Sequence, residues 1–147
     1  MVITDDGIVE ALQRIIAGDA AIAARLETYM FTTGLEDPAV FTTQVFPKNA
    51  RFPAIILDRV GGSDFGSRGK KGEDVGVDVR LYGDRDRDAR VLRKTAELLH
   101  GTLNRSTVAL VNGFEAFRCM ADPPQAVSDE DGFPGYLVRV RVLLIES

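Results

Sequence analysis

Three consecutive acidic residues, Asp129, Glu130 and Asp131, are the side chains of this sequence best placed to do chemistry together. Neighbouring carboxylates could exchange protons with a substrate or hold a divalent cation. A small metal-dependent hydrolase would need Asp129 and Asp131 to converge with a further carboxylate. Three acids directly before a glycine, here Gly132, are typical of a solvated loop tip. We therefore interpret the run as surface charge, with the hydrolase as an alternative.

The other residues with catalytic or metal-binding chemistry occur singly. His100 is the only histidine and Cys119 the only cysteine, so they cannot supply the usual nitrogen and sulfur ligands of a zinc site. No G-x-S-x-G motif is present that could offer a serine nucleophile. His100 is expected at the polar rim of a helix end, and Cys119, in an apolar run, as a buried and inert thiol. We expect no catalytic, cofactor-binding or metal-binding residue, and hence no enzyme.

Alternating aspartates at Asp84, Asp86 and Asp88 are similar to the start of an EF-hand calcium loop. Ala89 stands where that loop needs a glycine, and Thr95 replaces its twelfth-position carboxylate. The aspartates are better explained as negative charge at a helix N-terminus, which the helix dipole favours.

The composition argues against two classes of partner. The chain has 147 residues, 45% of them hydrophobic, which fits a single domain over residues 1–147 with its own core. Its formal net charge of -4 argues against a dedicated nucleic-acid-binding protein, which would carry a basic excess. No apolar run approaches the roughly 18 residues needed to cross a bilayer, and Asp5 and Asp6 stand where a signal peptide would be basic. We expect a protein of the cytoplasm in which it is made, with no membrane partner.

The hydrophobic pattern switches between the helix and strand periods. Every second residue is apolar from Val75 to Tyr82, which predicts a strand with one buried face and Asp78 and Arg80 on the other. Helices are expected at 8–16, at 20–26 after an Asp19 N-cap, and through 92–99 to a Gly101 C-cap. Strands are expected at 53–57, 113–121 and 135–145, with short extended segments at 28–33 and 40–46 around a turn at 34–38. This order predicts an α+β fold: a mainly antiparallel sheet of about four to five strands, with one long and one or two short helices packed on one face.

Charged residues are expected on the outer face of this sheet and in two long loops. Arg139 and Arg141 lie on one face of the last strand, matched by Asp78 and Arg80. That face is interpreted either as a solvated surface or as a polar subunit interface. Residues 61–72 hold five glycines besides charged residues, which favours a mobile connection between strands.

Several short signatures, taken with the element order, resemble one protein family. They are Ala17-Gly18-Asp19 after the first helix, Phe46-Pro47 and Phe52-Pro53 before an apolar strand, Arg59-Val60-Gly61-Gly62 after it, the passage from Val79 to Asp84, and Leu99-His100-Gly101. In this order they resemble the tail completion, or tail terminator, proteins of long-tailed siphophages and of gene transfer agents. The resemblance extends over roughly residues 5–145, although residues 27–45 depart from the shorter version typical of that family.

The resemblance implies a non-enzymatic structural protein that forms a hexameric ring. Such a ring caps the growing tail tube and stops the polymerisation of the tail tube protein. It also presents the surface that joins the head connector or head-closure protein. The resemblance also implies a location at the head-proximal end of the virion tail, with DNA passing through the lumen without sequence-specific binding. A head-closure or head-to-tail connector adaptor of the same particle is the alternative.

Two sets of residues receive roles on this basis. The subunit interface is expected at Asp78, Arg80, Arg139 and Arg141. The loops at 61–74 and 122–134 are expected to face the lumen or a stacked ring and carry Arg68, Lys70, Lys71, Asp129, Glu130 and Asp131.

Overall fold

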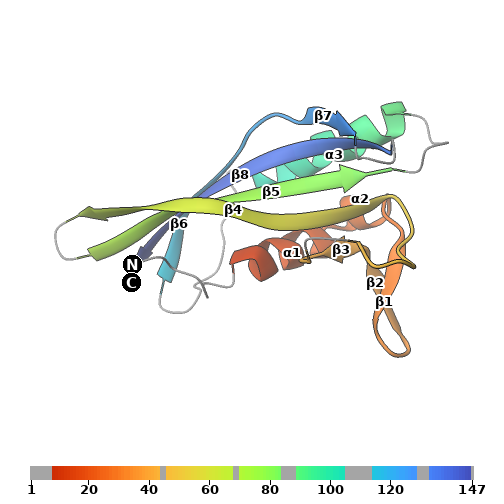
Figure 1. The fold of residues 1–147 in the computed structure, drawn as a ribbon, viewed down its shortest axis with the longest axis horizontal. Coiled ribbons are helices and arrows are strands. Elements are labelled where there is room, and N and C mark those ends of the chain that lie inside the picture. The colour runs from red at the N-terminus through yellow and green to blue at the C-terminus, as the bar shows by residue number, and fades with distance from the viewer. Residues whose placement is uncertain are drawn as a thin grey trace.

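A computed structural model describes residues 8–43, 46–67, 70–83, 89–104, 114–128 and 133–146. Its helices are α1 (Ile8–Gly18), α2 (Ala20–Ala23) and α3 (Ala89–Leu103). Its strands are β1 (Thr28–Thr32), β2 (Leu35–Pro38), β3 (Val40–Phe41), β4 (Ala54–Ser67), β5 (Lys70–Tyr82), β6 (Phe114–Ala121), β7 (Gln125–Ser128) and β8 (Pro134–Glu146). Figure 1 shows the helices behind one long sheet, and a hairpin of β1 and β2 that projects away from it.

The large sheet has the strand order β3-β4-β5-β8-β6, and β7 also pairs with β8. All of these pairings are antiparallel except that of β3 with β4. The strands β1 and β2 form a separate two-stranded sheet. The predicted α+β fold is confirmed, and the short strands β3 and β7 bring the large sheet to six strands.

The main core lies between the large sheet and the helices. In β5 the alternate residues Val75, Val77, Val79 and Leu81 are all buried, as their period of two predicted. They belong to the same cluster as the apolar stripes of α1 and α3, whose buried members include Ile8, Leu12, Ile16, Leu92, Ala96 and Leu99. The intervening residues of β5 therefore point to the opposite face of the sheet.

A second, smaller apolar cluster covers part of that opposite face. Its buried members are Ala39, Phe41, Ala54 and Ile56. Aromatic rings from the projecting hairpin pack on it, with the ring centroid of Tyr29 5.0 Å from that of Phe41. The base of the hairpin is held by the backbone N–H of Glu27, which donates to the carbonyl of Pro53 at 2.9 Å. The hairpin is thus fixed at its base while its tip points away from the sheet (Figure 1).

The predicted N-cap at Asp19 is confirmed, and its carboxylate also joins two helices. One oxygen, Oδ1, accepts hydrogen bonds from the backbone N–H groups of Ala21 at 3.0 Å and Ile22 at 3.2 Å. The other, Oδ2, accepts a hydrogen bond of 2.9 Å from the hydroxyl of Thr102 on α3. The Thr102 hydroxyl, together with these backbone amides, lowers the pKa of Asp19 below its ordinary value because all of them stabilise the ionised form.

The prediction of a loop over residues 61–72 is wrong for residues 61–67 and 70–72, which form strands. The strands β4 and β5 continue through most of it as an antiparallel hairpin, with register pairs from Gly62 with Val75 out to Ser67 with Lys70. Glycine in a strand costs about 0.5 to 1 kcal/mol relative to alanine, which does not forbid a strand. The inner part of this extension of β5 also pairs with β8, as far as Gly72 with Ile145. Local composition reveals neither the β4–β5 ladder nor the support that β8, far away in the sequence, gives to the inner part of β5.

The predicted loop at 122–134 also contains regular structure. Within it, β7 pairs with β8, from Gln125 with Leu137 to Ser128 with Pro134. Here too the partner strand imposes an extended backbone on a short segment that has little apolar pattern of its own.

Two predicted boundaries are corrected. Gly101 is not a C-cap, because α3 continues to Leu103, a fully buried residue whose packing outweighs the low helix propensity of glycine. The turn expected over 34–38 is confined to Thr33 and Gly34, and the next four residues form β2. Gly34 has a φ of +86°, a conformation that glycine adopts without strain.

Candidate subunit interface on the sheet

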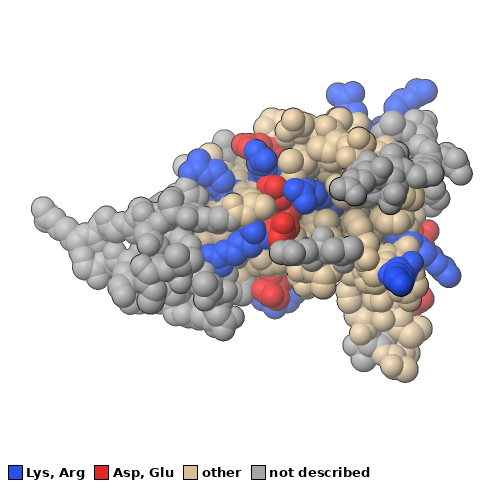
Figure 2. All heavy atoms as spheres, viewed as in Figure 1, with Lys and Arg blue, Asp and Glu red and all other residues tan. Residues whose placement is uncertain are grey.

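The face of the large sheet opposite the helices, called here the open sheet face, carries the charged residues that the sequence pattern grouped together. They are Asp58 on β4, Asp78 and Arg80 on β5, and Arg139 and Arg141 on β8. In register, Asp78 stands between Asp58 on one neighbouring strand and Arg139 on the other. Residues directly opposite each other in antiparallel strands share a face, so these side chains form one cluster. Figure 2, which looks onto this face, shows acidic and basic side chains close together over the middle of the sheet.

Asp78 is the centre of this cluster and is buried, with 3% of its surface exposed. Its Oδ1 accepts a hydrogen bond from Nε of Arg139 at 3.3 Å, and its Oδ2 lies 3.5 Å from Nη2 of Arg80. A carboxylate is costly to bury unless it is paired, and two guanidinium groups pair this one. The sequence predicted Asp78 as a residue facing water or a neighbouring subunit, and its burial corrects that view. It is buried because it lies on a central strand beside the longer side chains of Arg80 and Arg139.

The arginines of the cluster remain accessible. The side chain of Arg139 is 63% exposed and that of Arg80 is 39% exposed, and Arg141 is exposed as well. Two exposed apolar residues lie near them, Met120 directly opposite Arg141 in register and Val60 on β4. Oriented cations beside small apolar patches can form ion pairs and hydrogen bonds with another protein surface and bury apolar area at the same time.

The loop residues of the second predicted set are not brought together by the described structure. Lys70 and Lys71 are residues of β5, paired in register with Ser67 and Gly66. Arg68 lies outside the described residues, as do Asp129, Glu130 and Asp131. The aspartates at 84, 86 and 88, predicted to begin the long helix, also lie outside them.

The single histidine, His100, and the single cysteine, Cys119, both lie in surroundings that a structural role explains. Nε2 of His100 lies 3.0 Å from the carbonyl oxygen of Ala121, a distance at which it donates a hydrogen bond that ties α3 to the end of β6. Cys119 is buried, as its apolar neighbours predicted. Within the described stretches, no three His, Cys, Asp or Glu side chains gather as they would around a metal ion. No helix in those stretches has the length and apolarity that a membrane crossing requires.

The projecting hairpin is a surface that sequence reasoning did not assign. Its side chains Met30, Phe31 and Leu35 are exposed although they are apolar. Phe31 and Asp37 of the hairpin line a shallow groove together with Arg14 of α1. The one signal in the sequence was that residues 27–45 depart from the family pattern, and this could not show what the segment does.

Comparison with known proteins gives a match at the level of the fold. No family model matches the sequence, and no curated protein matches it. Among solved structures, a chain of the one described as "Virion of native gene transfer agent (GTA) particle" superposes with a TM-score of 0.74 at 16% sequence identity. The two chains share a fold. The match covers 99% of this chain and 100% of the other, so the shared fold extends from end to end.

Proposed function

We propose that this protein is the terminator of a phage-like tail, in a siphophage or in a gene transfer agent. In this role copies of the chain, each a single domain, close a ring of six subunits at the head-proximal end of the tail. The ring caps the tail tube, ends its polymerisation and offers a joining surface to the head connector or head-closure protein. The observation that carries the proposal is the fold shared over the full length with a chain of a gene transfer agent virion. The terminator-like signatures of the sequence add the specific role.

The open sheet face supplies one of the patches that such a ring needs. A ring closes through contacts between two different patches of the same chain, so each copy offers one patch to the copy before it and another to the copy after it. Arg139 and Arg141 are the exposed cations of the cluster around Asp78. These exposed cations suit a partner patch that carries acidic groups.

In this function the protein is not an enzyme and uses no cofactor. DNA passes through the ring during packaging and ejection, and a chain with a net charge of -4 does not hold it back. Adhesion to DNA depends mainly on the neutralisation of phosphates by lysine and arginine. The protein resides in the host cytoplasm during assembly and in the virion tail afterwards.

Native mass spectrometry and negative-stain electron microscopy of the purified protein test this proposal, with and without tail tube subunits of its own particle. We expect rings of one subunit number, and tubes whose growth stops when the protein is added. If rings form but the length of the tubes does not change, the head-closure or connector adaptor replaces the terminator as the proposed role. A chain that stays monomeric both alone and beside tube subunits would exclude both roles.

The part played by the open sheet face can be tested by charge reversal. Arg139→Glu is expected to reduce the yield of rings or change their subunit number, because it repels the acidic partner patch. Arg25→Glu is a matched control, since Arg25 is exposed and follows α2 on the helix side of the sheet. Rings of unchanged size and yield in Arg139→Glu would count against this face as the interface.

A further inference from the structure

Two exposed surfaces on opposite sides of the molecule complement each other in charge and in apolar character. We propose that the β1–β2 hairpin of one copy docks on the outer side of α3 of the next copy. This inference rests on the proposed ring, and it identifies a contact through which successive copies join.

The first surface is the hairpin arm, residues 28–38. The arm contains two acidic residues, Glu36 and Asp37, and no lysine or arginine. Met30 and Leu35 of the arm are 52% and 62% exposed, although neither is polar. Exposed apolar side chains of this size that lie close together are typical of a protein contact site.

The direction in which the arm presents its residues follows from its contacts. Tyr29 and Phe31 point toward the body of the protein, where their rings lie 5.0 Å and 5.2 Å from that of Phe41. Met30 lies between them in the strand and so points the other way. Glu36 shares the side of Met30, because its Oε2 accepts a hydrogen bond of 3.4 Å from the hydroxyl of Thr28. The outward side of the arm therefore combines an apolar side chain with a carboxylate.

The second surface is the α3 ridge, formed by residues 90–98 on the outer side of α3. Val91 and Leu98 are 47% and 37% exposed on this helix. Lys94 stands between them at three residues from one and four from the other, so the three side chains line one stripe. The ridge thus offers an apolar stripe with an ammonium group at its centre.

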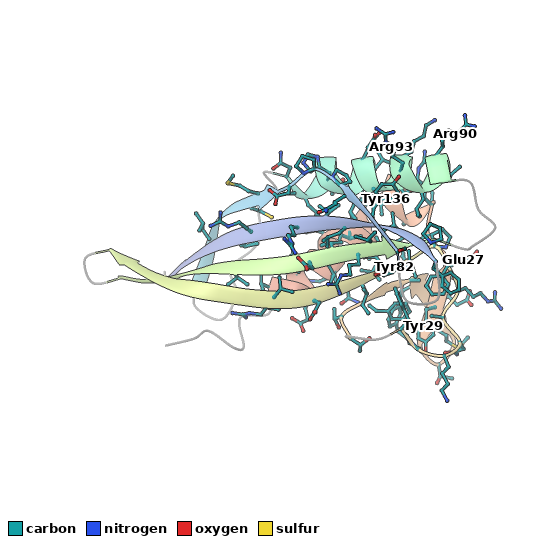
Figure 3. The ribbon with its side chains drawn as sticks, turned by 45° about the horizontal axis from the view of Figure 1, so that its top comes forward. Glu27, Tyr29, Tyr82, Arg90, Arg93 and Tyr136 are labelled. Carbon is teal, nitrogen blue, oxygen red and sulfur yellow. The ribbon has the colours of Figure 1, made fainter. Side chains whose placement is uncertain are left out.

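Further basic residues flank this stripe. Figure 3 shows Arg90 and Arg93 extending outward from α3, away from the sheet. The acid on this side of the helix, Glu97, already pairs with Arg93, whose Nε lies 3.4 Å from its Oε1. With Lys94, the ridge carries three cations and one anion, which is the opposite of the charge of the hairpin arm.

The position of the two surfaces requires that the contact be made between copies. In Figure 1 the hairpin arm extends from one side of the molecule while α3 lies on the other, and Figure 3 shows the same separation between Tyr29 and Arg93. The arm cannot reach the ridge of its own chain. A contact between unlike patches is heterologous, and it closes a ring when the rotation between copies permits.

A charge exchange between Glu36 and Lys94 tests the contact. Glu36→Lys and Lys94→Glu are each expected to weaken self-association about tenfold or more, because each places like charges against each other. The variant that carries both changes restores opposite charges, and we expect its self-association within about threefold of the wild type. The measurement is sedimentation velocity over a concentration series, with native mass spectrometry for the subunit number. Glu10→Lys, an exposed change of the same size on α1, is the control and is expected to behave as the wild type.

The outcomes separate this inference from the proposed function. If the wild type forms rings and both single variants form the same rings, the docking contact is overturned and the terminator role still stands. Weakened self-association in both single variants without recovery in the double variant would also overturn the direct pairing. A wild type that forms no ring, alone or with tail tube subunits, would overturn both proposals. Circular dichroism and a thermal melt of each variant distinguish lost docking from lost folding.

Discussion

Replacing Asp78 by asparagine tests whether its buried carboxylate organises the open sheet face. Asparagine keeps the shape of the side chain and removes its charge. The change takes the shared anion away from Arg139 and Arg80, which lie 3.3 Å and 3.5 Å from the carboxylate oxygens. Two guanidinium groups are then left beside each other without their common partner.

The size of the effect follows from how much of this network is buried. Removing one partner of a fully buried ion pair costs about 3 to 5 kcal/mol, and a hydrogen bond to a charged group contributes about 1.5 to 3 kcal/mol. Here Arg139 is 63% exposed and Arg80 39% exposed, so water replaces part of what each arginine loses. We therefore expect the free energy of unfolding to fall by about 1 to 2 kcal/mol. For a chain of this length that corresponds to a decrease in Tm of about 3 to 8 °C.

Urea unfolding, extrapolated linearly to water at one fixed protein concentration, measures this change. A double-mutant cycle with Arg139→Gln isolates the pair, and its coupling energy should be about 1 kcal/mol. Asp58→Asn is the matched control. Asp58 stands opposite Asp78 in register, and like charges at such positions repel, so its neutralisation should be neutral or slightly stabilising. A stability of Asp78→Asn within about 0.3 kcal/mol of wild type, with no coupling in the cycle, would refute this reasoning.

Three further predictions concern the packing and capping of the fold. Gly135→Ala should lower stability by about 1 to 3 kcal/mol, because its Cβ would lie 2.6 Å from Cδ1 of Tyr82 and 2.7 Å from the carbonyl oxygen of Leu81. Gly101→Ala, within α3 and with nothing within 4 Å of the new Cβ, should instead raise stability by about 1 kcal/mol, as chemical denaturation of both variants would show. Asp19→Ala should cost about 1 kcal/mol at neutral pH through the loss of the cap. Because folding lowers the pKa of Asp19, its contribution is complete above the ordinary carboxyl pKa and is lost as pH falls through the lowered value. The stability gap between wild type and Asp19→Ala should therefore close in acid, and a gap that stays constant with pH would contradict this.

The elements with a clear period were predictable from the sequence. The apolar stripe of α1, the alternation of Val75 to Tyr82 in β5, and the alternation at the end of the chain in β8 each lie where expected. In these segments the periodicity reflects burial on one side, which is also what decides the structure. The Asp19 N-cap was predictable for the same reason, since capping depends on residues that are close in sequence.

The elements that were missed depend on strand pairing and on burial, which local composition does not show. The glycine-rich residues 61–67 become strand through the β4–β5 ladder, and β7 is strand because β8 lies beside it. The end of α3 is likewise set by the burial of Leu103 and not by Gly101. Local propensity predicts structure poorly where strand pairing or burial stabilises an element by more than glycine or polar residues destabilise it.

The residues of the candidate site could be predicted from the sequence, but the contacts between them could not. Alternation alone grouped Asp78 with Arg80, and Arg139 with Arg141, on one face of the sheet. Only the register shows that Asp78 stands opposite Arg139, and only the packing shows that it is buried. The hairpin arm was missed as a surface because exposed apolar residues such as Met30 give the same pattern as buried ones.

The two sides of the sheet differ in what they contribute. The helix side is filled by apolar residues whose packing accounts for stability. On the open side, the buried Asp78 is a poor source of stability. A protein in which apolar residues of similar volume replace a buried ion pair is often as stable as the original or more stable. What the carboxylate achieves is orientation, because it fixes two arginines that remain exposed on adjacent strands. Arginines held in one direction lose less conformational entropy when they meet a partner surface, so this network would favour the subunit contact proposed for the open sheet face.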